Sequence, residues 1–160
     1  MVTPGGQQGM CIIARSLLDP GDEMIVPCPA YNPYQQATEL CDAVVVKVPM
    51  GMETNFTLIA TMIEPHITPH SKILGLINPN NPTGSVTPPD EVRKIADQAR
   101  KHDLIVISDE IDAKLVFGNH RVQPVASLPG MYERTITRSG FSKAYAMTGW
   151  RIGYIAGPQT

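Results

Sequence analysis

Apolar residues recur along the chain at two spacings, and each spacing predicts a different kind of element. A helical spacing of three or four positions occurs in residues 10–17, 35–41, 58–63 and 88–102. Short and nearly continuous apolar runs, which predict strands, occupy residues 24–26, 44–48, 73–77, 104–107 and 135–137. Helical and strand patterns therefore alternate along the chain, as they do in α/β proteins.

The apolar runs also indicate how the strands pack. In residues 104–107 (Leu-Ile-Val-Ile) every position is apolar, so both faces of that strand would be buried. Strands of this kind are typical of a mostly parallel sheet that is covered by helices on both faces. We predict a three-layer α/β fold, and 160 residues are enough to bury one core.

Composition and charge exclude several functional classes. The chain is 42% hydrophobic and 18% charged, and its formal net charge is −2. Neither a nucleic-acid partner nor a polybasic contact with a membrane is indicated by such a balance. No apolar run is long enough to span a bilayer, so we expect no membrane partner.

The spacing of cysteine and histidine indicates neither a disulfide framework nor a metal site. The three cysteines, Cys11, Cys28 and Cys41, form no Cys-x-x-Cys pair, and reduced thiols are typical of the cytoplasm. His66 and His70 are four positions apart, but a proline between them disrupts the helix on which they could share a metal. We therefore expect a cytoplasmic protein without a metal ion.

Four polar segments follow or precede the predicted elements where ligands bind in open α/β sheets, beyond the carboxyl ends of the strands. They are residues 5–9, 78–84, 108–110 and 139–143, the last together with 148–151. In the first segment, Gly5 and Gly6 open a helix, where free N–H groups and the helix dipole favour a phosphate. A plain helix start is the commoner reading of such glycines. Their spacing matches neither a dinucleotide nor a nucleoside-triphosphate motif.

The other three segments each contain a side chain with an alternative structural role. The prolines of Asn-Pro-Asn-Asn-Pro-Thr-Gly at 78–84 would make a rigid loop that aims an amide at the strand ends, or a simple turn. Asp109 follows a buried strand and needs a cationic partner such as a protonated pyridine, unless it is a cap or a structural ion pair. Lys143 could form an imine and Arg151 could bind a phosphate, although surface positions are the default for both.

Three motifs in this order resemble the fold-type I pyridoxal-phosphate enzymes, specifically the class I and II aminotransferases of the aspartate aminotransferase type. They are the 78–84 motif, Ile-Ser-Asp-Glu-Ile at 107–111, and Ser-Lys-Ala-Tyr-Ala-Met-Thr-Gly-Trp-Arg-Ile-Gly-Tyr at 142–154. The resemblance covers almost the whole chain. It implies pyridoxal 5′-phosphate as cofactor and an amino-group transfer between an amino acid and a 2-oxo acid through a Schiff base on Lys143.

The resemblance also assigns roles around the cofactor ring. Lys143 would carry the cofactor and later move a proton, and Asp109 would pair with the pyridine N–H; these two are the candidate catalytic residues. Asn81 would hydrogen-bond the phenolic oxygen of the ring. Tyr31 would stack on the ring, although a core or turn aromatic is its alternative reading.

A second group of residues would hold the cofactor phosphate. By the resemblance, the amides of Gly6 and Gln7 and the guanidinium of Arg151 bind it. The chain has Gly140 where many members have a serine that contacts the phosphate. We expect Ser142, next to the lysine, or Ser139 to take over that contact.

The chain departs from the family at one further position and in its extent. Asp112 stands where members usually have a tyrosine that donates to the phenolic oxygen. A carboxylate there, if it faces the cofactor, would favour the protonated Schiff base. By the resemblance, residues 1–160 are a partial large domain, and an N-terminal segment and a C-terminal small domain are absent. Family members are homodimers, and the absent segment leaves dimerisation of this chain open.

Two alternatives to a transaminase remain. Residues 108–117 also resemble pyridoxal-phosphate-dependent C–S β-lyases of the same fold, whereas Thr-Gly-Trp-Arg-Ile-Gly at 148–153 favours the aminotransferases. The abrupt ends of the chain and Asp112 favour an inactive fragment that still binds the cofactor. The sequence does not indicate which amino acid would be the substrate.

Overall fold

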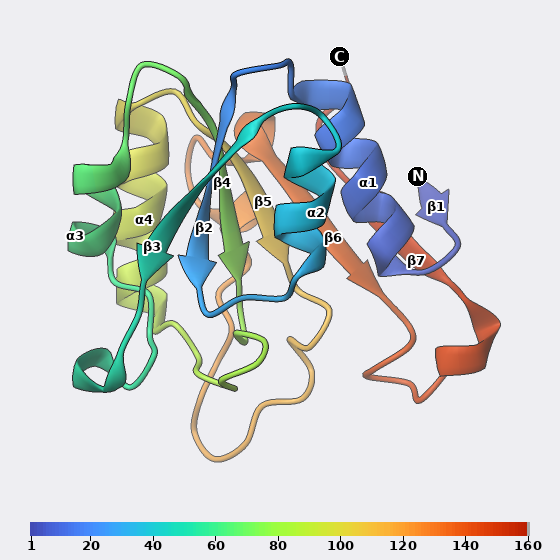
Figure 1. The fold of residues 1–160 in the computed structure, drawn as a ribbon. Helices are drawn as coiled ribbons and strands as arrows, with labels where there is room; N and C mark the ends of the chain where they lie inside the picture. The colour runs from blue at the N-terminus through green and yellow to red at the C-terminus, as the bar shows by residue number, and fades with distance from the viewer. Residues whose placement is uncertain (160) are drawn as a thin grey trace.

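The computed structural model describes residues 1–159 as a twisted sheet with helices on both of its faces (Figure 1). The helices are α1 (Gly6–Leu17), α2 (Pro33–Glu39), α3 (Ala60–Ile63) and α4 (Pro89–Lys101). The strands are β1 (Val2–Thr3), β2 (Glu23–Cys28), β3 (Val44–Pro49), β4 (Ser71–Ile77), β5 (Ile105–Asp109), β6 (Thr135–Gly140) and β7 (Gly153–Ala156). Short 3₁₀ turns are η1 (Met52–Thr54), η2 (Glu64–His66), η3 (Val125–Ser127), η4 (Tyr132–Arg134) and η5 (Thr148–Trp150).

The strand order of the sheet is β1-β7-β6-β5-β4-β2-β3. Strands β2, β3, β4, β5 and β6 are parallel to one another. Strand β7 pairs antiparallel with β6, and β1 pairs antiparallel with β7, so that β7 alone runs opposite to the other described strands. The predicted fold, a mostly parallel sheet in a three-layer α/β arrangement, is confirmed. The two edge strands β1 and β7 were not predicted, because two- and four-residue strands are too short to show a periodicity.

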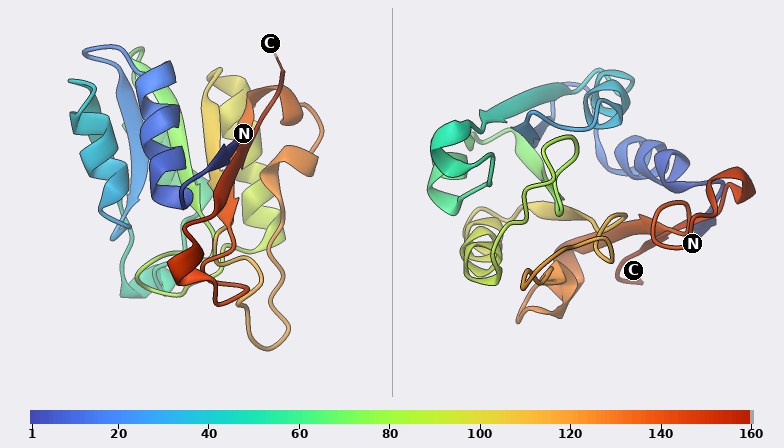
Figure 2. Two further views of the ribbon diagram at one scale, coloured as in Figure 1. Left: turned by 90° about the vertical axis from the view of Figure 1, so that its right-hand side faces the viewer. Right: turned by 90° about the horizontal axis from the view of Figure 1, so that it is seen from below.

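Two separate cores lie on the two faces of the sheet, and successive residues of each strand point alternately into one or the other. Helices α1 and α2 cover one face and α3 and α4 the other (Figure 2). The strand residues on the α1 and α2 side include Met24, Val26, Ile73, Ile77 and Ile107. Those on the α3 and α4 side include Ile25, Val48, Leu74, Leu76 and Val106. This explains why the central strands read as continuous apolar runs.

The boundaries of two strands differ from the sequence pattern in a way that matters for the site. Strand β5 continues past the apolar run to Asp109, because Asp109 pairs in register with Ile77 on β4 and with Arg138 on β6. Strand β6 likewise continues through Arg138 to Gly140. Asp109 is therefore the last residue of a strand rather than the first residue of a loop. Helix α3 is shorter than the predicted 58–63 segment.

The carboxyl ends of the five parallel strands lie at one edge of the sheet, which is the lower edge in Figure 1. The segments that leave this edge are residues 29–32, 50–59, 78–88, 110–124 and 141–147. Helix α1 begins at the same edge. All the polar segments singled out in the sequence are therefore brought to one end of the molecule.

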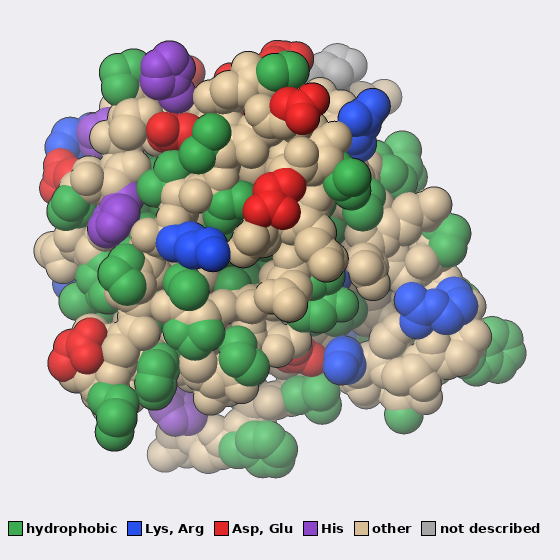
Figure 3. Space-filling view, in the orientation of Figure 1, with side chains coloured by type: hydrophobic (Ala, Val, Ile, Leu, Met, Phe, Trp, Pro, Cys, Tyr) green, Lys and Arg blue, Asp and Glu red, His purple; other side chains and the backbone are tan. Residues whose placement is uncertain are grey.

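Two surface properties bear on possible partners: the length of apolar helices and the distribution of charge on the face drawn in Figure 3. Within residues 1–159, no helix is long and apolar enough to cross a membrane. Charged side chains of both signs are scattered over the face drawn in Figure 3. On this face there is no concentrated basic patch of the kind that nucleic acids select.

Truncating a leucine in the core should reveal how much the packing on the α3 and α4 side stabilises the fold. Leu74 is 0% exposed, whereas Leu40 at the end of α2 is 67% exposed. We expect Leu74→Ala to lower the free energy of unfolding by about 2–5 kcal/mol, because it removes buried methyl groups and leaves a cavity. Leu40→Ala should change it by less than about 0.5 kcal/mol. Urea unfolding measures both, and equal losses would contradict the assignment of the core.

Candidate active site

A small cavity at the carboxyl edge of the sheet gathers four of the residues that the sequence singles out. Its volume is about 80 Å³, and it is lined by Tyr31, Ile77, Asn81, Asp109, Ile111, Asp112, Arg138 and Lys143. The four predicted site residues among them are Tyr31, Asn81, Asp109 and Lys143. They come from four separate segments of the chain, so only the fold brings them together.

Asp109 is the most buried charged group of this cavity, with only 1% of its side chain exposed. Its Oδ1 accepts a hydrogen bond from the backbone N–H of Ile111 at 3.3 Å. Its Oδ2 accepts one from the hydroxyl of Tyr34 at 3.0 Å and forms an ion pair with Arg138. Burial raises the pKa of Asp109, and the positive charge of Arg138 and the Tyr34 hydrogen bond oppose that rise.

Tyr34 and Arg138 are site residues that the sequence reasoning missed. Tyr34 lies in α2 and is fully buried, so that burial and the neighbouring carboxylate of Asp109 raise its pKa well above the ordinary value. Arg138 is 4% exposed at its side chain and stands beside Asp109 in the β5–β6 ladder. An arginine directly after the predicted strand 135–137 and immediately before the lysine motif was the available signal for it.

The asparagine-proline loop owes its shape to two side chains that do not face the cavity. Asn78 bonds the backbone of Thr87 twice, accepting from its N–H at 3.0 Å and donating to its carbonyl at 3.3 Å. Asn80 donates to the carbonyl of Pro29 at 3.2 Å and to the hydroxyl of Thr83 at 2.9 Å. The loop is thereby tied to its own end and to the segment after β2. Asn81 is left to line the cavity, and its hydrogen bond to the phenolic oxygen of the ring stays a prediction.

Lys143 lies in the tight turn that follows β6, with its side chain exposed at the cavity rim. The turn is closed by backbone hydrogen bonds from Ala146 to Lys143 at 3.1 Å and from Met147 to Phe141 at 3.3 Å. The ring of Phe141 packs against that of Tyr145, with 5.5 Å between ring centroids. Backbone hydrogen bonds and aromatic packing thus fix the turn that carries Lys143.

The predicted phosphate turn is built by glycines that leave room for a guanidinium. Gly5 has a φ of +79°, and a Cβ atom on it would overlap the guanidinium of Arg151. Gly6 and Gln7 are the first two residues of α1, whose first turn contains no acidic side chain. Opposite them, a Cβ on Gly153 would lie 2.6 Å from the backbone of Gly5 and Gly6. The helix N-terminus and Arg151 together make a cradle suited to an anion.

Comparison with known proteins decides the family. The model of the family described as aminotransferase class I and II matches residues 1–160, which is the whole chain. The chain belongs to this aminotransferase family.

Over the aligned residues, similar proteins within the family are about two fifths identical to this chain. The aspartate aminotransferase of Musicola paradisiaca is 40% identical over 159 residues, which are 99% of this chain and 40% of that protein. The aromatic-amino-acid aminotransferase 2 of Thermococcus litoralis is 39% identical, over 99% of this chain and 41% of that protein. This aminotransferase chain therefore spans about 40% of the length of these relatives.

Solved aminotransferase structures share the fold. An aromatic aminotransferase from Pyrococcus horikoshii superposes with a TM-score of 0.96 at 40% identity, over 99% of this chain and 42% of that one. The aspartate aminotransferase from Thermus thermophilus with maleate superposes with a TM-score of 0.94 at 38% identity, covering 99% and 41%. Over the matched residues, the fold of this chain is thus that of these solved aminotransferases.

Neither serine near Gly140 of this aminotransferase chain has a visible contact with the phosphate cradle. A side chain at position 140 would be crowded, because a Cβ there would lie 3.1 Å from both Ile111 and the carbonyl of Ile152. The hydroxyl of Ser139 donates instead to the carbonyl of Glu110 at 3.2 Å. Ser142 is half-buried and does not line the cavity, so its role as a phosphate ligand stays a prediction.

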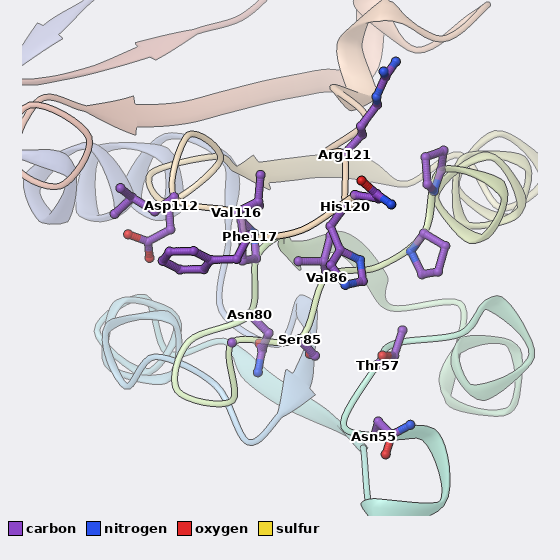
Figure 4. Close-up of a pocket in the computed structure, with 16 residues that line it drawn as sticks. Asn55, Thr57, Asn80, Ser85, Val86, Asp112, Val116, Phe117, His120 and Arg121 are labelled. Carbon is purple, nitrogen blue, oxygen red and sulfur yellow. The ribbon is translucent and has the colours of Figure 1, made fainter.

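A much larger cavity of about 810 Å³ adjoins the small one in this aminotransferase chain. Asp112 lines both cavities and is half-buried between them. In Figure 4, Asp112 and Phe117 lie on one side of the large cavity, across from Asn55 and Thr57. The only acidic side chain that lines the large cavity within residues 1–159 is thus the one that reaches the predicted cofactor site.

The cradle should depend on Gly153. We expect Gly153→Ala to push the Gly5–Gly6 backbone away, to weaken the binding of inorganic phosphate, and to lower the free energy of unfolding by about 1–3 kcal/mol. Gly149→Ala is a matched control in the same segment, because a Cβ there meets nothing within 4 Å. Phosphorus NMR titration and urea unfolding measure the two effects. If Gly153→Ala changed phosphate binding and the free energy of unfolding no more than Gly149→Ala does, this geometry would be contradicted.

Proposed function

We propose that this chain forms the cofactor-binding part of a pyridoxal 5′-phosphate-dependent transaminase, with Lys143 as the lysine that carries the cofactor. The substrates are an amino acid and a 2-oxo acid. The observation that carries the proposal is one small cavity that contains Lys143, Asp109, Asn81 and Tyr31 at the sheet edge where α1 begins. Residues 1–160 are in this proposal a part of the large domain.

The residues of the site fit the chemical groups of this cofactor. The guanidinium of Arg151 lies where a Cβ of Gly5 would stand, so it is beside the N-terminus of α1. Both groups are positive, and together they suit the phosphate. Asp109 offers a buried carboxylate to the ring N–H, and the amide of Asn81 faces the same cavity. Tyr31 lines the cavity and supplies a flat face for the ring. When bound, pyridoxal phosphate supplies a carbonyl group that condenses with amines and a ring that withdraws electrons from the substrate α-carbon.

The side chain of Lys143 performs two tasks in this proposal. Its Nζ is first the amine that holds the cofactor in the cavity. When it does not hold the cofactor, the same Nζ would take a proton from the substrate α-carbon or return one to it. The closed turn and the aromatic packing around Phe141 keep this amine at the cavity rim during both tasks. The carboxylate of Asp109 supplies a negative charge to the cavity, and the hydrogen bond from Tyr34 orients this carboxylate.

The relatives named above support transamination. They are aspartate and aromatic aminotransferases, which favours an amino-group transfer over the C–S β-lyase reaction. We extend the proposal to a cytoplasmic location, which is supported by the free thiols of Cys11, Cys28 and Cys41.

Chemical trapping tests the role of Lys143. The chain is mixed with pyridoxal phosphate, reduced with borohydride and digested, and the modified lysine is located by peptide mass. We expect modification of Lys143, its loss in Lys143→Arg, and its retention in Lys114→Arg, a control lysine that is exposed and contacts Tyr145 of the same region. Modification of a different lysine, or none, would overturn the proposal.

The charge of Asp112 should affect the pH at which the absorbance of the bound cofactor changes. A carboxylate beside the lysine-linked chromophore favours its protonated form. We therefore expect Asp112→Asn to move the pH midpoint of the absorbance change to lower pH, and Asp112→Glu to leave it near the original value. A pH titration of absorbance measures the midpoint. An unchanged midpoint in Asp112→Asn would mean that this carboxylate does not act on the chromophore.

A further inference from the structure

The guanidinium of Arg138 spans the two parts of the site that the proposed function assigns to opposite ends of the cofactor. At one end, its Nη1 pairs with Oδ2 of Asp109. At the other, its Nε donates to the carbonyl of Gly6 at 2.7 Å, and its Nη2 lies 3.0 Å from where a Cβ of Gly6 would stand. One side chain thus connects the carboxylate meant for the ring nitrogen with the turn meant for the phosphate.

The small cavity, whose wall includes Arg138, has less volume than pockets that usually hold ligands. Its volume of about 80 Å³ compares with roughly 300–1,000 Å³ for pockets that hold small-molecule ligands. Oδ1 of Asp109 already accepts from Ile111, and Oδ2 already accepts from Tyr34 and Arg138. A carboxylate has about four acceptor positions, so a ring N–H would compete with these donors. Of the donors, only Arg138 is a long side chain that can turn away.

The charges around Arg138 show where it would turn. The guanidinium lies against the first residue of α1, and the N-terminus of a helix repels a cation. Arg151 adds a second cation at the neighbouring Gly5, and the first turn of α1 contains no acidic side chain. Asp109 is the only ion-pair partner of Arg138 within residues 1–159. An anion at the turn would give Arg138 a new partner after a shift of its guanidinium alone.

We propose, on the basis of the proposed function, that Arg138 exchanges partners when the cofactor binds. In the free chain it is the counter-ion of Asp109. In the complex the cofactor phosphate becomes the partner of Arg138, and the ring N–H takes its place on Asp109. The exchange leaves no buried charge unpaired, because the cofactor brings one cationic N–H and one phosphate dianion. Arg138 is thus both a phosphate ligand and a competitor for Asp109.

The exchange predicts opposite effects of Arg138→Met on the binding of two ligands that each carry one part of the cofactor, pyridoxal and inorganic phosphate. Pyridoxal, which has the ring but no phosphate, should bind at least about tenfold more tightly, because Asp109 is no longer occupied. Inorganic phosphate should bind at least about tenfold more weakly, because one charge-assisted donor is lost. Arg151→Met is the matched control. It should weaken phosphate binding and leave pyridoxal binding unchanged, since Arg151 does not contact Asp109.

Absorbance titration measures pyridoxal binding, and phosphorus NMR measures phosphate binding. Equal weakening of both ligands by Arg138→Met would show a merely structural role and would overturn the exchange. An unchanged pyridoxal affinity would overturn it as well, because it would mean that Arg138 does not compete for Asp109.

A second variant covers the case in which Arg138→Met fails to fold because Asp109 is left buried without a partner. Asp109→Asn frees Arg138, so we expect it to bind inorganic phosphate more tightly than the original chain. The double variant Asp109→Asn, Arg138→Met should lose that gain. An affinity for inorganic phosphate that is the same in Asp109→Asn as in the original chain would contradict the exchange. This arm involves no lysine chemistry, so its failure is separate from a failure to trap the cofactor on Lys143.

Discussion

The burial of one carboxylate organises the whole site. Asp109 ends a central strand with its side chain almost completely excluded from water, where an unpaired charge is unfavourable by several kcal/mol. Within residues 1–159, three groups donate hydrogen bonds to its side chain: the Ile111 N–H, the Tyr34 hydroxyl and the Arg138 guanidinium. These donors come from the following loop, from α2 and from β6. Satisfying this charge therefore holds a loop, a helix and a strand of the molecule in a defined relation.

The parallel sheet turns distant segments into neighbours. Parallel strands end at the same edge, so the loops that follow β2, β4, β5 and β6 converge there. Each loop is then fixed locally. Asn78 and Asn80 tie down the loop that presents Asn81, and aromatic packing holds the turn that presents Lys143. Chemistry is thus placed on loops, and rigidity comes from the sheet beneath them.

The positive turn at the start of α1 and the negative side chain of Asp109 lie at opposite ends of the Arg138 guanidinium. The cradle of α1 and Arg151 is positive, and the wall at Asp109 is negative. Arg138 links the two in the free chain, which stabilises the site before any ligand enters. Asp112 adds a second carboxylate between this small cavity and the large one. A ligand with a phosphate at one end and a cationic ring at the other matches this distribution.

The sequence by itself determined the mostly parallel α/β fold and the motifs of the family, because apolar periodicity and short motifs are local properties. The same local signals led to Tyr31, Asn81, Asp109 and Lys143, which share one cavity. Only the tertiary structure decided the edge strands β1 and β7 and the partners of Asp109. Arg138 is 29 positions from Asp109 and Tyr34 is 75 positions away. Such contacts depend on strand register and helix packing, which a pattern of apolar residues does not encode.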